Sequence, residues 1–225
     1  MTFDVGQTLA ELDLDFLCRR LDERGHTVAP AALHAAAPAA WDRYEALVRE
    51  GARHPWKALM HALLAGAGIA DPEPLVEWLW TEQPAKNLWR KPIQPMVDLA
   101  RELAARGARV GVLSNSEGRL AELLAEIGIA DAFATITDSG RIGIEKPDPR
   151  IFAHTLAALD AGEVSTDAPP IHIGDLWNAD IQGAINAGWR AIWYGKHATP
   201  VDDPRIAIAR DAAEARAALV AWSAL

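Results

Sequence analysis

Apolar side chains in the first third of the chain recur at helical spacing, and none of these runs alternates as a strand does. Between residues 10 and about 90 they return every three or four positions, which is the pattern of a helix with one buried face. Glycine or proline punctuates the runs, and Pro38 is expected to break or kink the second of them. The pattern therefore predicts a small helical bundle over residues 10–89.

From Pro92 onward the pattern changes to alternating helices and strands. Helical spacing separates apolar runs that predict strands at residues 108–113, 170–173 and 190–194. Two shorter extended pieces are predicted at 133–137 and 141–144, joined by a turn at Asp138-Ser139-Gly140. Strictly alternating strands and helices predict an α/β fold, with a parallel sheet covered by helices on both faces.

The parallel sheet is expected to begin at the N-terminus, pause for the helical insertion and then resume. Only Met1, Thr2 and Phe3 precede Asp4, whereas a buried strand usually has about 5–6 residues. The first strand is therefore either unusually short or cut by a late start site.

Size and charge narrow the possible partners. A chain of 225 residues can bury a sizeable core as one large domain, or as one domain with an insertion. The formal net charge of −9 argues against nucleic acid as a partner, because binding a phosphate backbone needs a basic face. A small anionic substrate stays compatible with that charge, since it responds to the local field of a pocket. The sequence does not indicate an oligomeric state.

The compartment follows from what the sequence lacks. No stretch approaches the roughly 20 apolar residues of a membrane helix, so no membrane partner is expected. The N-terminus has no basic segment followed by an apolar run, as a secretory signal would. The single cysteine, Cys18, excludes an internal disulfide and fits a reducing environment. We therefore expect a cytoplasmic protein.

Four short segments at or near predicted strand ends carry chemically useful side chains. Asp4 ends the first strand, and its carboxylate could attack a phosphoryl group or hold a metal ion. The Ser114 hydroxyl and the Lys146 ammonium group suit anionic oxygens. Asp175 and Asp180 follow a later strand, and carboxylates converging with Asp4 would form the oxygen-rich site that Mg²⁺ prefers.

Each of these segments alone has an ordinary structural explanation. A lone aspartate after a strand caps a turn, a serine before a helix caps that helix, and acids at a helix start satisfy its dipole. Four such matches in one order, three of them at strand ends, are improbable as accidents. We therefore interpret them together as one phosphoryl-handling site.

These segments resemble the motifs of the haloacid dehalogenase (HAD) superfamily, and the resemblance covers nearly the whole chain. Asp4 with Thr8 is similar to the first motif, Ser114-Asn115 to the second, Lys146-Pro147 to the third, and the segment from Gly174-Asp175 to Asp180 to the fourth. The resemblance implies a Rossmann-like core formed by residues 1–9 and 90–225, and a helical C1-type cap at residues 10–89 that closes over small-molecule substrates.

The resemblance also implies a role for each matching residue. Asp4 would form an aspartyl-phosphate, while Ser114 and Lys146 would hold the phosphoryl oxygens. Mg²⁺ would be bound by Asp4, Asp175 and the backbone carbonyl of Gly6, with Asp180 in support. Two further residues, Thr8 and Asn115, are expected to contact the substrate.

Gly6 is the departure from the family pattern. The family's phosphatases have an aspartate at this position, which protonates the leaving group and later activates water. Gly6 keeps the carbonyl but cannot transfer a proton, and loss of general acid–base help costs about 10²–10⁴-fold in rate. Gln7 cannot titrate, so a replacement acid would come from the cap, where His54 and Lys57 are the candidates.

Three functions remain open at this point. The first is a Mg²⁺-dependent hydrolase acting on a small phosphorylated metabolite. The second is a phosphate-ligand binder that kept the metal site and lost efficient turnover. The third is a dehalogenase- or phosphonatase-like hydrolase, although Gly174-Asp175 favours a metal site over metal-free dehalogenase chemistry. The substrate itself is not identified.

Overall fold

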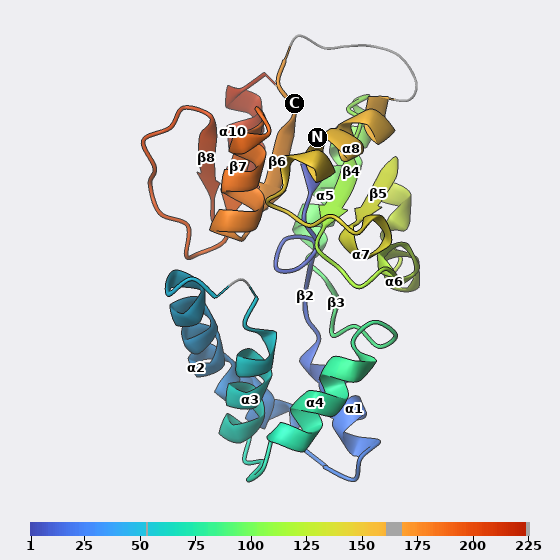
Figure 1. The fold of residues 1–225 in the computed structure, drawn as a ribbon, viewed down its shortest axis with the longest axis vertical. Helices are drawn as coiled ribbons and strands as arrows, with labels where there is room; N and C mark the ends of the chain where they lie inside the picture. The colour runs from blue at the N-terminus through green and yellow to red at the C-terminus, as the bar shows by residue number, and fades with distance from the viewer. Residues whose placement is uncertain (53, 161–167, 224–225) are drawn as a thin grey trace. The chain divides into compact units, whose positions relative to one another are not determined.

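The chain divides into two compact units. The computed structural model describes residues 1–52, 54–160 and 168–223 (Figure 1). One unit comprises Met1–Leu12 and Trp89–Leu225, and the other comprises Asp13–Leu88. The first unit contains the sheet and the helices around it, while the second is helical (Figure 1).

The sheet of the first unit has six strands in the order β5-β4-β1-β6-β7-β8. All five neighbouring pairs are parallel. The strands are β1 (Thr2–Phe3), β4 (Gly111–Ser114), β5 (Thr135–Asp138), β6 (Ile171–Gly174), β7 (Arg190–Tyr194) and β8 (Ile206–Ala209). The α/β prediction, with a Rossmann-like parallel sheet, is therefore confirmed. In such a sheet the carboxyl ends of the strands share one edge, where ligands bind.

Helices cover both faces of this sheet. Neighbouring residues of a strand point to opposite faces, so each of two adjacent residues of β4 shows what packs on its own side. Val112 of β4 belongs to the apolar cluster that includes helices α5, α6 and α10, whereas Leu113 belongs to the cluster that includes α8 and α9. The helical elements are α5 (Gln94–Ala105), α6 (Leu120–Glu126), α7 (Ser139–Ile142), α8 (Pro149–Asp160), α9 (Gly183–Asn186), α10 (Ala212–Ala221), a 3₁₀ turn η1 (Ala130–Ala132) and a π-helical turn η2 (Trp177–Gln182).

β1 is short, yet it lies in the middle of the sheet. Thr2 pairs with Gly111 of β4 on one side and with His172 of β6 on the other. The backbone N–H of Asp4 continues this pairing by donating to the carbonyl of Ile173 at 2.8 Å. The chain therefore leaves the middle of the sheet at Asp4.

The second unit consists of α1 (Leu14–Asp22), α2 (Pro30–Arg49), α3 (Trp56–Gly66) and α4 (Glu73–Glu82). Asp13 caps α1 by accepting the N–H of Phe16 at 2.8 Å. Pro38 does not break the helix as one alternative predicted, because α2 runs through this residue, and the alternative of a kink stays a prediction. None of the described helices combines the length and the apolar character that crossing a membrane demands.

A two-stranded antiparallel ribbon joins the units along the chain. It pairs β2 (Ala10–Leu12) with β3 (Trp89–Pro92), and Lys91 Nζ lies 2.7 Å from Glu11 Oε1. The sequence pattern placed helix from residue 10 to about 90 and missed both strands. Each segment has too few residues to show a period, and the two pair only because the chain leaves and re-enters the core at the same place.

Two further details differ from the sequence prediction. Residues 141–144 were expected to be extended, but Ser139–Ile142 is a short helix whose first turn is capped by the Asp138 side chain, which accepts the N–H of Gly140. Strand β8 was not predicted, since its Ile-Ala-Ile-Ala run alternates only weakly in polarity.

Candidate active site

The candidate site lies at the carboxyl ends of three adjacent strands. Asp4 follows β1, Ser114 is the last residue of β4, and Asp175 follows β6. Because β1 lies between β4 and β6, the strand order itself brings these three residues side by side.

Lys146 connects the carboxylates of the site. Its Nζ donates to Asp4 Oδ1 at 2.7 Å, to Asp180 Oδ1 at 2.5 Å and to the carbonyl of Leu113 at 2.9 Å. The side chain of Lys146 is only 2% exposed. Its pKa lies above the ordinary lysine value, because attraction to Asp180 and Asp4 outweighs the desolvation that opposes the charge. The lysine is therefore a fixed positive charge beside Asp4.

Asn115 fixes the backbone that carries this lysine. Its Oδ1 accepts the N–H of Lys146 at 2.8 Å, and its Nδ2 donates to the carbonyl of Lys146 at 3.0 Å. Both ends of the Asn115 amide thus contact Lys146, so the structure gives Asn115 a positioning role. Contact with substrate stays a prediction for this residue.

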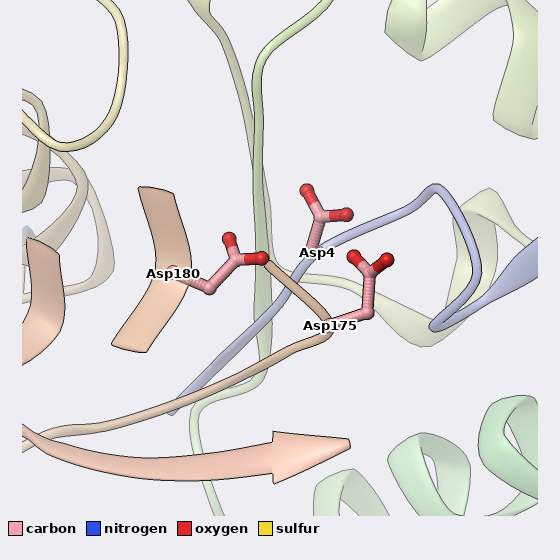
Figure 2. A group of neighbouring side chains, drawn as sticks. All are labelled: Asp4, Asp175 and Asp180. Carbon is pink, nitrogen blue, oxygen red and sulfur yellow. The ribbon is translucent and has the colours of Figure 1, made fainter. Parts of the chain in front are cut away.

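Three buried carboxylates, those of Asp4, Asp175 and Asp180, surround a common region (Figure 2). One oxygen of each lies within 4.8 Å of the others. Burial raises the pKa of Asp4 and Asp175, and repulsion from Asp180 adds to the increase in both cases. Among the described residues, the Lys146 ammonium group is the lysine charge that contacts this cluster, and it offsets only part of the negative charge. The donor set of carboxylate oxygens and the uncompensated charge fit a hard divalent cation such as Mg²⁺.

Asp180 is held differently from the other two carboxylates. Its Oδ1 accepts Lys146 Nζ and also His172 Nε2, the latter at 3.0 Å, and its Oδ2 accepts the N–H of Leu176 at 2.8 Å. Burial opposes its charge, but Lys146 and His172 prevail and hold the pKa of Asp180 below the usual range. Both oxygens already have protein donors, so Asp180 supports the cluster through Lys146.

Gly174 gives Asp180 the space that it occupies. A Cβ added to Gly174 would lie 2.3 Å from Asp180 Cγ, far inside van der Waals contact. The Gly174-Asp175 pair identified in the sequence thus has two separate functions: the aspartate supplies a carboxylate, and the glycine leaves room for the next one.

The first loop of the site carries Gly6 and Thr8. A Cβ at Gly6 would meet only Asp4 Oδ2, at 4.0 Å, among the described residues outside its chain neighbours, so a Cβ is accommodated there. Gln7, the next residue, has a φ of 54° and carries the left-handed backbone of this turn. Thr8 is completely buried, and its Oγ1 has no hydrogen-bond partner within the described residues. Its contact with substrate stays a prediction.

The two candidate replacement acids belong to the helical unit. Lys57 Nζ lies 2.6 Å from Glu77 Oε1, and the His54 Nδ1 lies 3.3 Å from the hydroxyl of Tyr44. Neither contact gives them an acid–base role, which therefore stays a prediction.

Sequence reasoning missed several residues that support the site. Asp138 accepts the N–H groups of Gly118, Leu120 and Gly140, and so fixes the loop that follows Ser114. His172 contacts Asp180, as described above. Trp193 Nε1 and His197 Nε2 lie 2.9 and 2.8 Å from the carbonyl oxygen of Asp175. A signal existed only for Asp138, which opens the turn predicted at Asp138-Ser139-Gly140.

Comparison with known proteins agrees with this geometry. Residues 2–188 match the profile of the haloacid dehalogenase-like hydrolases. The chain belongs to this family of hydrolases, and phosphatases are among its relatives.

Three similar proteins show how far the likeness extends. A phosphoserine phosphatase of Thermus thermophilus is 31% identical over 71% of this chain and 75% of its own length. The haloacid dehalogenase-like hydrolase domain-containing protein 3 of Bos taurus is 30% identical over 59% of this chain, which spans about half (52%) of that relative. The magnesium-bound structure of the HAD-hydrolase YfnB from Bacillus subtilis has a TM-score of 0.66 at 20% identity, covering 97% of this chain and 96% of that one. The last comparison shows the fold alone.

Proposed function

We propose that this protein is a Mg²⁺-dependent hydrolase that forms an aspartyl-phosphate from a small phosphorylated metabolite. The observation that carries the proposal is the contact of Lys146 with Asp4 and Asp180 beside Asp175, at the carboxyl edge of the sheet. The name of the phosphoserine phosphatase relative supports a phosphorylated substrate.

Asp4 is the proposed nucleophile. One of its carboxylate oxygens attacks phosphorus, the new Asp4–phosphorus bond forms, and the bond from phosphorus to the leaving-group oxygen breaks. Lys146 favours the ionised carboxylate that this attack needs, because its Nζ lies 2.7 Å from Asp4 Oδ1. Water then attacks the same phosphorus, releasing phosphate and regenerating Asp4. Ser114 and Lys146 hold the phosphoryl oxygens during both steps.

The metal ligands in this proposal are Asp4, Asp175 and the backbone carbonyl of Gly6, with Asp180 in support. Bound there, Mg²⁺ would neutralise charge on the phosphoryl oxygens. The uncompensated charge of the buried carboxylates supports this assignment, and the fold neighbour from Bacillus subtilis is bound to magnesium.

Gly6 restricts the leaving groups that such a site can expel quickly. With no carboxylic acid at this position, the departing oxygen receives no proton from the residue that supplies it in family phosphatases. The proposal therefore favours phosphates whose leaving group is already a weak base, such as acyl and aryl phosphates. Gly6 also motivates a second candidate function, which is a phosphate-ligand binder that turns over slowly or not at all.

We further propose that the helical unit Asp13–Leu88 is a cap that selects the substrate. Its compact fold and its insertion between β2 and β3 support this assignment. It directly follows β2 and directly precedes β3 in the sequence. In this proposal, one part of the chain selects the substrate and the other carries out the chemistry.

A substrate panel tests the proposed function. Acyl, aryl and alkyl phosphates and a 2-haloacid are assayed with Mg²⁺ and with a chelator, in wild type and in Asp4→Asn. We expect Mg²⁺-dependent phosphate release by wild type that the variant lacks. Binding of phosphate without turnover would favour the binder, and metal-independent release of halide would favour dehalogenase-like chemistry.

A further inference from the structure

A buried histidine behind the site has no place in the mechanism above. His172 of β6 has no exposed surface, and its partner Thr2 of β1 has none either. The Thr2 hydroxyl lies 2.8 Å from His172 Nδ1, and His172 Nε2 lies 3.0 Å from Asp180 Oδ1. These contacts form a continuous chain from Thr2 through His172 and Asp180 to Lys146 and Asp4.

Hydrogen-bonding capacity determines the direction of this chain. The Asp180 carboxylate can only accept, so His172 must carry its proton on Nε2. Burial lowers the pKa of His172, which favours the neutral ring. With Nε2 protonated, Nδ1 of a neutral ring can only accept, and the Thr2 hydroxyl is its donor. The opposite tautomer would direct a lone pair at the carboxylate.

The contacts are also well placed to control Lys146. Asp180 Oδ1 is shared by His172 Nε2 and Lys146 Nζ. The position of the His172 ring therefore helps to determine the position of the carboxylate oxygen that Lys146 contacts. Thr2 and His172 are register partners on adjacent strands, which makes the ring position a property of the sheet. Sheets are stiffer than loops as supports for a site.

We propose that Thr2 and His172 are positioning residues for the site: Thr2 fixes the ring with its proton on Nε2, and this N–H holds Asp180 in register with Lys146. The catalytic consequence rests on the proposed function, whereas the hydrogen-bond direction does not. Partners of this kind typically change metal affinity or activity by about 10–100-fold when they are lost.

The first measurement is the tautomer of His172 in the wild-type protein, by long-range proton–nitrogen correlation on ¹⁵N-histidine-labelled material. The resonance is assigned by its absence in His172→Gln. We expect the Nε2–H tautomer. The Nδ1–H tautomer would overturn the proposal, whether or not the protein hydrolyses any phosphate.

The second measurement compares three conservative variants. Thr2→Val removes the hydroxyl at almost constant volume, and Thr2→Ser restores it. Thr155→Val is the matched control, because Thr155 is equally buried and donates to Thr137 Oγ1 at 3.0 Å elsewhere in the core. All three are compared by thermal melting, by kcat and KM on the best phosphate of the panel, and by Mg²⁺ affinity.

We expect Thr2→Val to lower kcat or Mg²⁺ affinity about tenfold, while Thr2→Ser and Thr155→Val stay within about twofold of wild type. Equal losses in Thr2→Val and Thr155→Val would show a contribution to stability only and would overturn the positioning role. If wild type hydrolyses no phosphate, the proposed function fails, and the tautomer and the Mg²⁺ affinity still decide the role of the pair.

Discussion

At the scale of single residues, the proposed mechanism lacks a general acid at position 6, where Gly6 has no side chain to donate a proton. We expect Gly6→Asp to raise kcat on alkyl phosphates most, because those leaving groups depend most on a proton donor. An added Cβ at this position would lie 4.0 Å from Asp4 Oδ2, which is ordinary van der Waals contact. The gain should approach about 10²-fold, because an added group is seldom ideally placed. Steady-state assays across the phosphate panel measure it.

Two controls accompany this variant. Gly6→Asn adds a similar volume without an acid, and Asp4→Asn in the Gly6→Asp background should abolish turnover. If Gly6→Asp folds, binds Mg²⁺ and gains nothing on any ester, the absent acid is not what limits the rate.

Gly174 leads to a second prediction at this scale. We expect Gly174→Ala to destabilise the protein by about 1–3 kcal/mol, because the new methyl group overlaps Asp180 and displaces it from Lys146. Urea denaturation measures the loss. Gly6→Ala is the matched control, as its methyl group has room; an equal loss in both variants would show that the overlap at Asp180 is not the cause.

The residues that sequence reasoning could find are those whose role depends on local context. Asp4, Ser114 and Asp175 each stand at the end of an apolar run, so their position in the sheet could be predicted. Thr2 and His172 could not, because a buried threonine and histidine become partners only through the register between strands 170 residues apart.

At the scale of elements, the loop after Ser114 is held by the side chain that ends the neighbouring strand β5. Asp138 ends β5 as the register partner of Ser114, and its Oδ2 accepts the N–H of Leu120 at 2.9 Å. We expect Asp138→Asn to cost about 1–3 kcal/mol, because one buried backbone donor loses its acceptor. Urea denaturation of this variant beside Asp131→Asn, whose side chain is 71% exposed, measures the difference. A loss no larger than that of the surface variant would contradict the prediction.

The elements that the pattern misjudged, β2, β3, β8 and α7, have only three or four residues each. The strands among them pair with segments distant in sequence, while α7 is capped by Asp138. Strands β4 and β6 are equally short, but they lie in continuous apolar runs that carry their own signal, as do β7 and the longer helices.

At the scale of the whole molecule, metal binding at the proposed site should raise the free energy of unfolding. We expect Mg²⁺ at about 100 times its Kd to stabilise wild type by about 2.7 kcal/mol, and to leave Asp175→Ala unchanged. Without metal the variant should be no less stable than wild type, because it removes a carboxylate that is buried beside Asp4 and Asp180. Thermal melting with and without Mg²⁺ measures both effects. Asp203→Ala, which removes an acid paired with Arg205 at the surface, is the control that should keep the full response.

The ribbon allows the helical unit to be removed cleanly. Leu12 and Trp89 are register partners in the antiparallel pair, so an Asn-Gly turn can join them in place of Asp13–Leu88. We expect the shortened chain to fold, to keep its Mg²⁺ response and to change its ranking of substrates. Circular dichroism and the phosphate panel measure these. A chain that cannot fold would show that the helical unit is structural support and not an independent cap.

Because β1 lies between β4 and β6, it is synthesised before either strand with which it pairs. Its two partners, β4 and β6, leave the ribosome long after it does, since Thr2 and His172 are separated by 170 residues. At about 5–20 residues per second, the contiguous Asp13–Leu88 segment has seconds in which to fold before β1 can pair with another strand. The nascent chain therefore passes through a stage in which the insertion is complete while its host is still open.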